Sequence, residues 1–297
     1  MKVLVLGASG MLGHKVLRVL SRRFETHGTV RSPNDALAQI APEAAGVIEG
    51  VSATDRESVS RAISDVRPHA IVNCIGIVKQ LKEATDPISS ILVNSLFPHQ
   101  LAEVSRVAGA RLIHVSTDCV FSGRIGNYTE DDTPDPVDLY GRSKLLGETA
   151  APHALTIRTS IFGRELDGAH GLVEWFLNQN GGTVSGFRGA VFSGWSTTAL
   201  ARAIGDILET QPDLAGLWHV AATPITKFDF LSLVRDAFEL DVMIEPDDDF
   251  ACNRSLDGSR FRATTGISAP EWPQMVDELH EESALYDALR EPRVAGR

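Results

Sequence analysis

Three side chains in the middle of the sequence have the types and the spacing of an acid–base catalytic set. Thr117 follows an apolar, strand-like run, and Tyr140 and Lys144 stand four residues apart at the start of a helical pattern. Residues four apart share one face of a helix, so the phenol and the ammonium would point the same way. A free phenol has a pKa of about 10, and a neighbouring ammonium lowers it by favouring the phenolate. We therefore predict a catalytic tyrosine supported by a lysine, with the Thr117 hydroxyl bonded to the reacting oxygen.

A Tyr–Lys pair at this spacing is common on helix surfaces, and alone it is weak evidence. The beginning of the chain strengthens it. Residues 3–6 are continuously apolar, which is typical of a strand buried on both faces, and the glycine-rich sequence GASGMLG follows. Such a turn lets a pyrophosphate approach the backbone at a helix N-terminus. We expect the turn to bind the cofactor through Gly7, Ser9, Gly10, Met11 and Leu12.

The end of the second predicted strand bears on the choice of nicotinamide cofactor. That strand is expected at residues 26–30, and Arg31 follows it directly. An acidic residue here would bind the ribose 2′-hydroxyl of NAD, whereas an arginine suits the 2′-phosphate of NADP. The alternative is an ordinary surface arginine. We predict NADP(H) in preference to NAD(H), and we place the residues at the end of the fourth strand beside the cofactor: Cys74, Ile75 and Gly76.

Strand-like segments alternate with helical patterns through the first 160 residues. This alternation predicts an α/β fold with a doubly wound parallel sheet, the Rossmann fold. We expect residues 1–160 to form the NADP-binding domain, with 183–215 returning to it. Residues 161–297 are expected to form mostly a smaller C-terminal α/β substrate-binding part. The expected strands of the sheet are 3–6, 26–30, 47–51, 70–74, 112–115 and 154–158.

Helical and strand-like patterns alternate less regularly in the C-terminal part. The acidic run Asp247-Asp248-Asp249 could suggest a metal site, but a solvated loop is the simpler interpretation. The nine histidines show no metal-ligand spacing, so we expect no metal. Helices are expected at 172–178, 197–208, 227–238 and from 273 to about 289, strands at 217–220 and 242–245, and a glycine-rich passage at 181–194.

Charge and composition exclude several classes of partner. The formal net charge of -11 argues against nucleic acid. No apolar run approaches the roughly 20 residues that a membrane span needs. The N-terminus lacks the layout of a signal peptide, and three scattered cysteines suit a reducing compartment. We therefore expect a cytoplasmic protein that binds neither nucleic acid nor a membrane.

Together the motifs resemble the extended short-chain dehydrogenase/reductase family, and within it the dTDP-4-dehydrorhamnose reductase group. The resemblance implies that Thr117, Tyr140 and Lys144 form the catalytic triad. It also implies NADPH-dependent reduction of the C4 ketone of a nucleotide-linked 4-keto-6-deoxy sugar, in the biosynthesis of cell-surface polysaccharides, and it is compatible with a homodimer. The similarity covers nearly the whole chain and is carried by GASGMLG at 7–13, VNCIG at 72–76, STDCVFSG at 116–123, YTEDDTPDPVDLYGRSKLLGE at 128–148 and LTIRTSIFG at 155–163.

A nucleotide sugar carries a diphosphate, which an acidic protein must hold with local basic groups. Asp118 stands beside the threonine of the triad, where it could orient the loop or relay protons. The candidate cations are Arg164, Arg188 and Arg262, although each alone could equally be a surface arginine. Cys119 stands where these reductases usually have a tyrosine, so a related substrate such as an N-acetylated UDP-sugar remains open.

Two other functions remain open. The first is a sugar-nucleotide epimerase or dehydratase of the same superfamily. Related dehydratases carry Asp-Glu after the threonine, whereas this chain has Asp118-Cys119, and such enzymes usually retain NAD, which Arg31 disfavours. The second is a non-catalytic NADP-binding redox sensor. Loss of the tyrosine or the lysine would indicate a sensor, and both are present.

Overall fold

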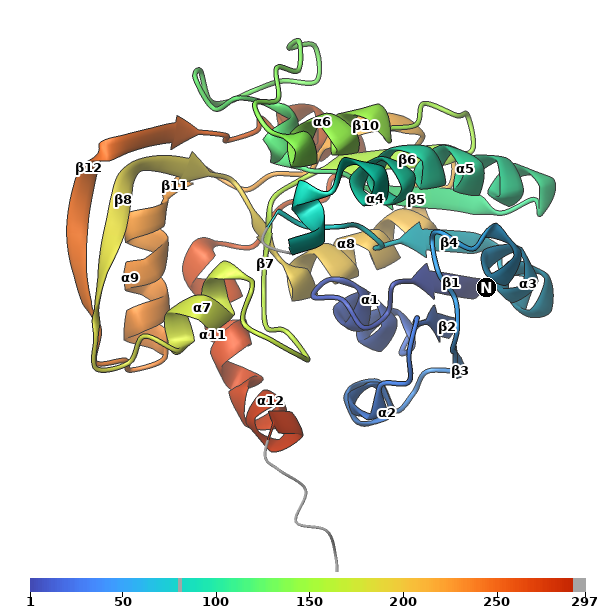
Figure 1. Cartoon of the computed structure of the whole chain (residues 1–297), viewed down its shortest axis with the longest axis horizontal. Coiled ribbons are helices and arrows are strands. Elements are labelled where there is room, and N and C mark those ends of the chain that lie inside the picture. Colours follow the sequence, from blue (N-terminus) through green and yellow to red (C-terminus); the bar gives the residue numbers. More distant parts are fainter. Residues whose placement is uncertain (80–81, 291–297) are drawn as a thin grey trace, which may run out of the picture.

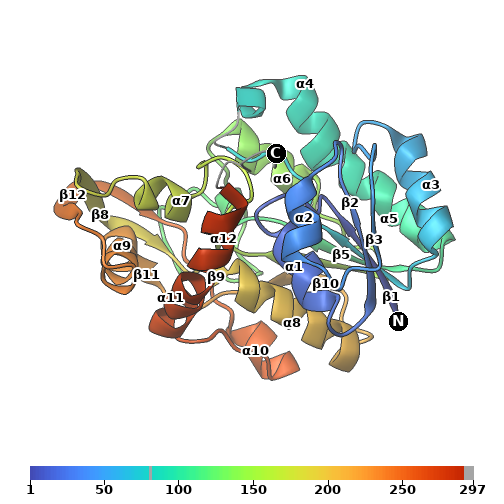
Figure 2. The same ribbon diagram turned by 90° about the horizontal axis from the view of Figure 1, so that it is seen from below.

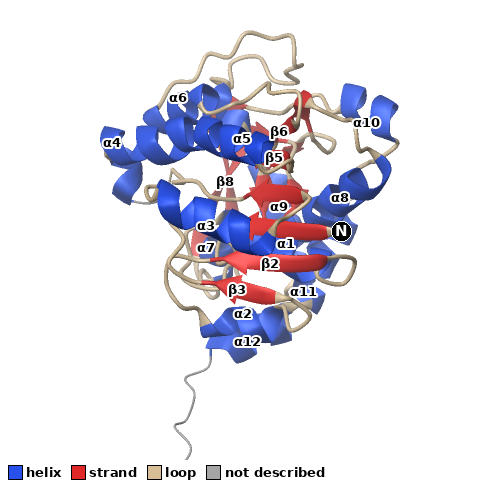
Figure 3. Cartoon of the chain, turned by 90° about the vertical axis from the view of Figure 1, so that its right-hand side faces the viewer, coloured by secondary structure: helices blue, strands red, loops and turns tan. Residues whose placement is uncertain are grey.

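The computed structural model describes residues 1–79 and 82–290. Its centre is a seven-stranded parallel sheet with helices on both faces, and a smaller sheet stands at one side (Figures 1 and 3). This confirms the predicted doubly wound α/β fold. The strands lie in the order β10-β6-β5-β4-β1-β2-β3 and comprise β1 (Lys2–Leu6), β2 (Glu25–Thr29), β3 (Gly46–Ile48), β4 (Ala70–Asn73), β5 (Arg111–Val115), β6 (Ala154–Arg158) and β10 (Gly216–His219).

The first strand shows why both faces of this sheet are covered. Its side chains alternate between faces and are all fully buried from Val3 to Leu6. Val3 and Val5 belong to the core beneath α1 and α8, whereas Leu4 and Leu6 belong to the core beneath α3 and α5. The helices on the first face are α1 (Gly13–Leu20) and α8 (Thr197–Thr210), those on the second are α3 (Arg56–Val66) and α5 (Phe97–Val107), and α2 (Asp35–Ile40) lies near β3 (Figure 2).

Side-chain caps define where several of these helices begin. The carboxylate of Asp55 accepts hydrogen bonds from the backbone nitrogens of Glu57 (3.0 Å) and Ser58 (3.2 Å) at the start of α3. The hydroxyl of Ser196 accepts one from Ala199 (3.1 Å) at the start of α8. Asx and Ser caps satisfy amide groups that have no partner within the helix. Both helices therefore start where the sequence places a cap.

The helical region between β4 and β5 is divided into three pieces. A short helix α4 (Pro87–Ser90) is followed by a π-helical segment, Ile91–Leu96, and then by α5. Within the π-helical segment the buried side chain of Asn94 bonds both backbone groups of Ile77, at 2.9 and 3.0 Å, and the hydroxyl of Ser143 at 3.2 Å. These bonds connect the loop after β4 to the helix that carries Tyr140.

The smaller sheet has the order β11-β8-β12 and packs against α9 (Figure 1). The glycine-rich passage expected at 181–194 is largely a ten-residue strand, β8. Its glycines permit close packing, because a Cβ on Gly186 would lie 2.5 Å from Ile244 and one on Gly189 2.6 Å from a backbone oxygen. The strand expected at 242–245 extends to Asn253. The elements are β8 (Thr183–Phe192), β11 (Ile225–Thr226), β12 (Met243–Asn253) and α9 (Lys227–Ala237).

The remaining elements include a third sheet, formed by the two parallel strands β7 and β9. The final helix expected from residue 273 is interrupted at Glu282, which separates α11 from α12. Helix α8 and strand β10 pack with the large sheet, while β8 lies in the small one. The division of the chain into domains stays a prediction. These elements are α6 (Leu139–Leu146), β7 (Ile161–Phe162), α7 (Leu172–Leu177), β9 (Trp195–Ser196), α10 (Ser259–Thr265), α11 (Trp272–Glu281) and α12 (Ser283–Arg290).

Candidate active site

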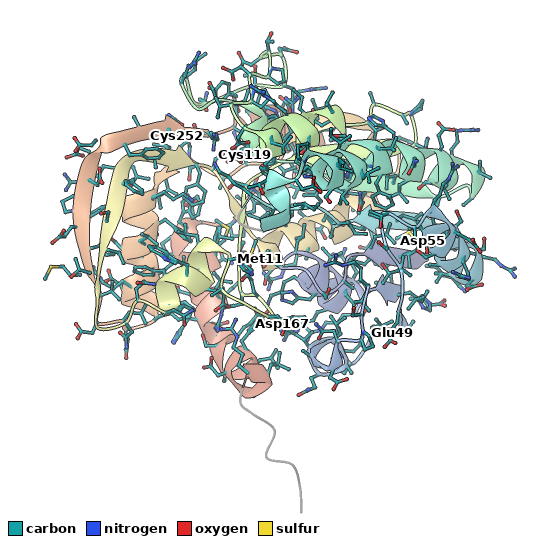
Figure 4. All side chains as sticks on the ribbon, in the orientation of Figure 1. Met11, Glu49, Asp55, Cys119, Asp167 and Cys252 are labelled. Atoms are coloured by element: carbon teal, nitrogen blue, oxygen red, sulfur yellow. The ribbon has the colours of Figure 1, made fainter. Side chains whose placement is uncertain are left out.

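A cavity of about 580 Å³ opens at the carboxyl ends of the large sheet's strands and extends to the small sheet. This edge of an open parallel sheet is where such folds bind ligands. Figure 4 shows Cys119 and Cys252 toward one end of the space between the sheets, and Met11 and Asp167 toward the other. The residues that line the cavity and matter below are Ser9, Gly10, Met11, Leu12, Cys74, Ile75, Gly76, Thr117, Asp118, Cys119, Tyr140, Lys144, Glu165, Asp167, Gly171, Lys227, Cys252 and Arg254.

The three candidate catalytic side chains all line this cavity. Tyr140 and Lys144 lie on α6, which begins after Asp138, whose carboxylate accepts a hydrogen bond from Gly141 at 2.8 Å. A Cβ on Gly141 would lie 2.2 Å from the carbonyl oxygen of Cys119. Glycine at this position therefore allows α6 to approach the turn after Thr117 closely, which brings the tyrosine to the threonine.

The electrostatic environment of Tyr140 differs from the expectation. Burial and the nearby Cys119 and Asp118 raise the pKa of the phenol above its usual value, and a hydrogen bond with Thr117 opposes this. Lys144 is not among the largest influences on this pKa. Burial also lowers the pKa of the Lys144 ammonium, to about 8. A phenol with a raised pKa keeps its proton near neutral pH, which is the form that a general acid requires.

The glycine-rich turn has the shape of a dinucleotide cradle. Gly7 has φ 77°, a left-handed conformation that favours glycine. A Cβ on Gly13 would lie 2.0 Å from the carbonyl oxygen of Gly7, so the turn closes only without a side chain there. Gly7 shapes the turn but does not line the cavity. The cavity is lined by seven of the residues expected to contact the cofactor: Ser9, Gly10, Met11, Leu12, Cys74, Ile75 and Gly76.

The predicted arginines lie elsewhere. Arg31 is exposed after β2 and does not line the cavity. Arg164 is buried and paired with Glu174 at 2.6 Å. Arg188 lies at the surface of the small sheet, where it pairs with an aspartate at 3.6 Å, and Arg262 is exposed on α10. The structure brings none of them to the cavity, because the packing of distant segments, and not position in the sequence, determines the direction of each side chain.

Two cations of the cavity were missed by the sequence analysis. Arg254 follows β12 and donates a hydrogen bond to the carbonyl of Phe121 at 3.0 Å. Lys227 begins α9, and its Nζ lies 3.8 Å from the centre of the Phe192 ring. The ammonium forms no hydrogen bond or ion pair with any residue that the structure describes, and burial lowers its pKa to about 8. A positive charge in the first turn of a helix interacts unfavourably with the helix dipole. This was the one feature of the sequence that could have marked Lys227 as a functional residue.

The residues that the structure describes contain neither a metal-binding cluster nor a membrane-spanning helix. Within residues 1–79 and 82–290, no group of three or more His, Cys, Asp or Glu side chains is arranged to hold a metal. The run of aspartates at 247–249 forms part of β12. None of the helices in the described part of the chain is long and apolar enough to cross a membrane.

The sheet, the glycine turn and the Thr–Tyr–Lys set together define an extended short-chain dehydrogenase/reductase. Residues 1–284 match the family described as RmlD substrate binding domain, and the chain belongs to this family. This relationship confirms the prediction of an NAD(P)-dependent oxidoreductase similar to dTDP-4-dehydrorhamnose reductases.

Two curated relatives have different descriptions. "Probable low-salt glycan biosynthesis reductase Agl14" of Haloferax volcanii is 31% identical, over 77% of this chain and 78% of the relative. "Methionine adenosyltransferase 2 subunit beta" of Mus musculus is 26% identical, over 96% of this chain and 91% of the relative. The two descriptions therefore include both a reductase and a subunit of another enzyme.

Solved structures share the fold over almost the entire chain. A hypothetical dTDP-4-dehydrorhamnose reductase from Sulfolobus tokodaii is 30% identical with a TM-score of 0.77, covering 92% of this chain and 98% of that chain. The Bacillus anthracis reductase in complex with NADP is 20% identical with a TM-score of 0.77, over 95% and 99%. Bordetella bronchiseptica WbmG in complex with NAD and UDP is 18% identical with a TM-score of 0.77, over 96% and 94%.

Proposed function

We propose that this protein reduces the C4 ketone of a nucleotide-linked 4-keto-6-deoxy sugar, with NADPH as the hydride donor, in nucleotide-sugar metabolism for cell-surface polysaccharides. One observation carries the proposal. Thr117, Tyr140 and Lys144 line a single cavity that residues 9–12 of the glycine turn also line. A hydride donor and an acid–base group must meet at one carbonyl, and this cavity offers space for both.

The chain's own residues fit a dinucleotide and the proton transfer. A side chain on Gly13 would clash with the backbone of Gly7 and one on Gly7 would clash with Ile75, so the turn that would bind the diphosphate closes only with glycine at both positions. NADPH, when bound, supplies the hydride that forms the new C4–H bond. As the carbonyl electrons move to O4, Tyr140 donates its phenolic proton to that oxygen, so the product is an alcohol. The Thr117 hydroxyl hydrogen-bonds O4 and orients the ketone, and Lys144 holds the nicotinamide ribose.

The preference for NADPH depends on Arg31. Its exposed guanidinium directly follows Val30, near the strand end where an adenosine ribose would lie. The related structures contain NADP in one case and NAD in another, so the family is compatible with either cofactor. An arginine supplies a charge-assisted partner for the 2′-phosphate that an NAD-binding site does not need.

The sugar diphosphate requires cations within the cavity, and Lys227 and Arg254 now replace the three arginines expected from the sequence. A buried ammonium without a hydrogen bond or ion pair to the described residues favours an anionic ligand, because desolvating a charge is costly unless it is paired. Both groups belong to the part of the cavity formed with the small sheet. With its diphosphate at these two cations, the nucleotide of the substrate would lie on one side of Tyr140 and the cofactor on the other.

A second candidate is a non-catalytic, cofactor-binding subunit. The observation that favours it is the match to methionine adenosyltransferase 2 subunit beta over nearly the whole chain. An epimerase or dehydratase stays less favoured, since Cys119 leaves the second carboxylate missing. The expected homodimer and cytoplasmic location remain predictions.

A substrate panel separates these functions. Purified protein is mixed with NADPH and, in turn, with dTDP- and UDP-linked 4-keto-6-deoxy sugars, and oxidation is followed at the nicotinamide absorbance. Turnover that disappears in Tyr140→Phe supports the reductase. Tight cofactor binding without turnover of any keto-sugar would favour the subunit function, and product formation without net cofactor oxidation would favour the epimerase or dehydratase.

A further inference from the structure

The C-terminal helix α12 packs beside the N-terminal helix α1, although the two lie at opposite ends of the chain (Figure 2). Their contact is a hydrogen bond of 2.6 Å between the hydroxyl of Tyr286 and Nε2 of His14, both of them buried. The other ring nitrogen of His14, Nδ1, lies 2.8 Å from the carbonyl oxygen of Gly10. Gly10 belongs to the glycine turn, so α12 reaches the candidate cofactor site through one histidine.

The direction of these bonds follows from the protonation state of His14. Burial and the nearby Lys15 lower its pKa to about 3, so the ring is neutral near neutral pH. A neutral imidazole carries one N–H, and the carbonyl of Gly10 can only accept. Nδ1 therefore donates to Gly10, and Nε2 accepts a hydrogen bond from Tyr286. The phenol thus selects the histidine tautomer that holds the turn.

Charged groups reinforce the same contact. The buried ammonium of Lys15 on α1 pairs with the carboxylate of Glu282, which directly precedes α12. Arg18, one helical turn further along α1, pairs with the same carboxylate at 3.2 Å. Two cations of α1 therefore hold the start of α12.

The end of α12 holds the opposite wall of the cofactor region. Arg290 donates to the Glu174 carboxylate at 2.7 Å and to the carbonyl of Glu165 at 2.8 Å. Glu174 also pairs with Arg164, whose guanidinium lies 4.9 Å from the centre of the Tyr286 ring. The helix therefore reaches the glycine turn through His14 and contacts the loop that begins at Arg164 directly.

The carboxylate of Glu165 keeps that loop in its shape. It accepts hydrogen bonds from the backbone nitrogens of His170 (2.8 Å) and Gly171 (3.0 Å). A Cβ on Gly171 would lie 3.3 Å from the sulfur of Met11, so the loop meets the glycine turn directly. Met11, Glu165 and Gly171 all line the cavity, and Figure 4 shows Met11 and Asp167 at this end.

From these contacts we infer that α12 is a positioning element for the nicotinamide dinucleotide, with Tyr286 and Arg290 holding the two walls of its site at a fixed separation. The inference rests on the proposed function, since it requires that this end of the cavity binds the dinucleotide. Neither residue touches the reacting atoms. Their loss should therefore weaken cofactor binding while leaving the chemical step at saturating cofactor nearly unchanged.

The test uses the full-length chain and the variant Tyr286→Phe, which keeps the ring and removes only the hydroxyl. We expect the Kd for NADPH to rise roughly three- to tenfold, the range of one net hydrogen bond, with kcat changed less than twofold. Amide hydrogen exchange should accelerate at residues 9–13 and 164–171. Tyr128→Phe is the matched control. It removes another buried hydroxyl, 3.2 Å from the nitrogens of Gly123 and Ile125, and should leave the NADPH Kd unchanged.

A second pair of variants distinguishes the proposed role of α12 from a folding defect in Tyr286→Phe. Arg290→Gln changes the contacts of α12 with Glu165 and Glu174 and leaves the bond of Tyr286 to His14 in place. Arg202→Gln is its control, because it removes an ion pair of the same length, 2.7 Å from Glu278, away from this site. Wild-type Kd and exchange rates in both Tyr286→Phe and Arg290→Gln would overturn the inference. If the wild type bound no nicotinamide cofactor, the proposed function would fail. Hydrogen exchange, which needs no cofactor, would still show whether α12 holds the two walls.

Discussion

The ammonium of Lys144 donates a hydrogen bond of 2.8 Å to the carbonyl oxygen of Val115, the last residue of β5. This bond joins the helix that carries Tyr140 to the strand that leads to Thr117. Lys144 is therefore a candidate cofactor-binding residue, and it also connects the helix of Tyr140 to the strand before Thr117. A substitution of Lys144 should therefore affect cofactor binding and the geometry of the catalytic residues together.

Lys144→Ala should weaken NADPH binding and reduce turnover together. In the wild type the lysine pKa of about 8 also predicts a pH dependence. The charged form is present below that value and is lost as pH rises through it, so cofactor affinity should fall above about pH 8. Fluorescence titration of NADPH from pH 6.5 to 9.5 measures this. The alanine variant serves as the control, and a decline of equal size in both proteins would contradict the assignment.

Tyr140→Phe should reduce turnover by roughly 10²- to 10⁴-fold, the usual contribution of a general acid. The Kd for NADPH should stay within twofold of wild type, because the ring and its packing remain. Stopped-flow reduction of a cognate keto-sugar at saturating NADPH gives the rate. Activity within tenfold of wild type would show that another group protonates O4.

Lys227→Met should raise the KM for the nucleotide sugar by roughly 10- to 150-fold, which corresponds to one charge-assisted hydrogen bond of about 1.5–3 kcal/mol. The melting temperature should be equal or higher, because the variant removes a desolvated charge that forms no hydrogen bond or ion pair with the described residues, and attraction by the Asp118 carboxylate offsets only part of that burial. Arg188→Gln, which changes an exposed cation outside the cavity, is the control. An unchanged KM in Lys227→Met would remove this lysine from the substrate site.

Arg31→Asp should reverse the preference between NADPH and NADH. The arginine offers the 2′-phosphate a charge-assisted bond, whereas a carboxylate would repel it and accept hydrogen bonds from the ribose diol. Titration of both cofactors into the wild type and the variant gives the two affinity ratios. Equal affinities in the wild type would mean that Arg31 points away from the ribose.

Folding stability should fall as the pH is lowered from 7.5 to 5.0. Burial lowers the pKa of His14 to about 3 and that of His219 to about 4, from a usual value of 6.5. Between these values the unfolded chain binds protons that the folded chain does not, so acid favours unfolding. Each histidine should cost about 2 kcal/mol at pH 5.0. Urea unfolding at both pH values tests this, with His219→Gln as the comparison. A free energy of unfolding that is independent of pH would refute it.

The parts of the fold and site that are local in sequence could be predicted. Alternating apolar runs and the glycine turn specify the parallel sheet, and the four-residue spacing of Tyr140 and Lys144 specifies a shared helix face. Strand β8 could not be recognised, because Gly186 and Gly189 look like loop residues until the neighbours that require them are known. The raised pKa of Tyr140 also depends on burial, which spacing does not reveal.

The cations that line the cavity could not be predicted from the sequence either. Lys227 stands far from every recognised motif, and only the packing of the small sheet brings it to the cavity. Arg164 adjoins a motif, and yet its guanidinium is engaged by Glu174 in the interior. Side-chain direction depends on contacts between distant segments, so it must come from three-dimensional structure.

The π-helical segment Ile91–Leu96 has a consequence for how this chain tolerates insertions and deletions. Each residue of a regular helix turns the next by about 100°, so removing one residue here would convert the segment to α-helix and rotate part of its surface. Asn94 would then face away from Ile77 and Ser143, its present hydrogen-bond partners. The loop after β4 and the helix of Tyr140 would lose their common support while the overall fold stayed the same. The number of residues between Pro87 and Val107, and not only their identity, should therefore determine whether the site keeps its geometry.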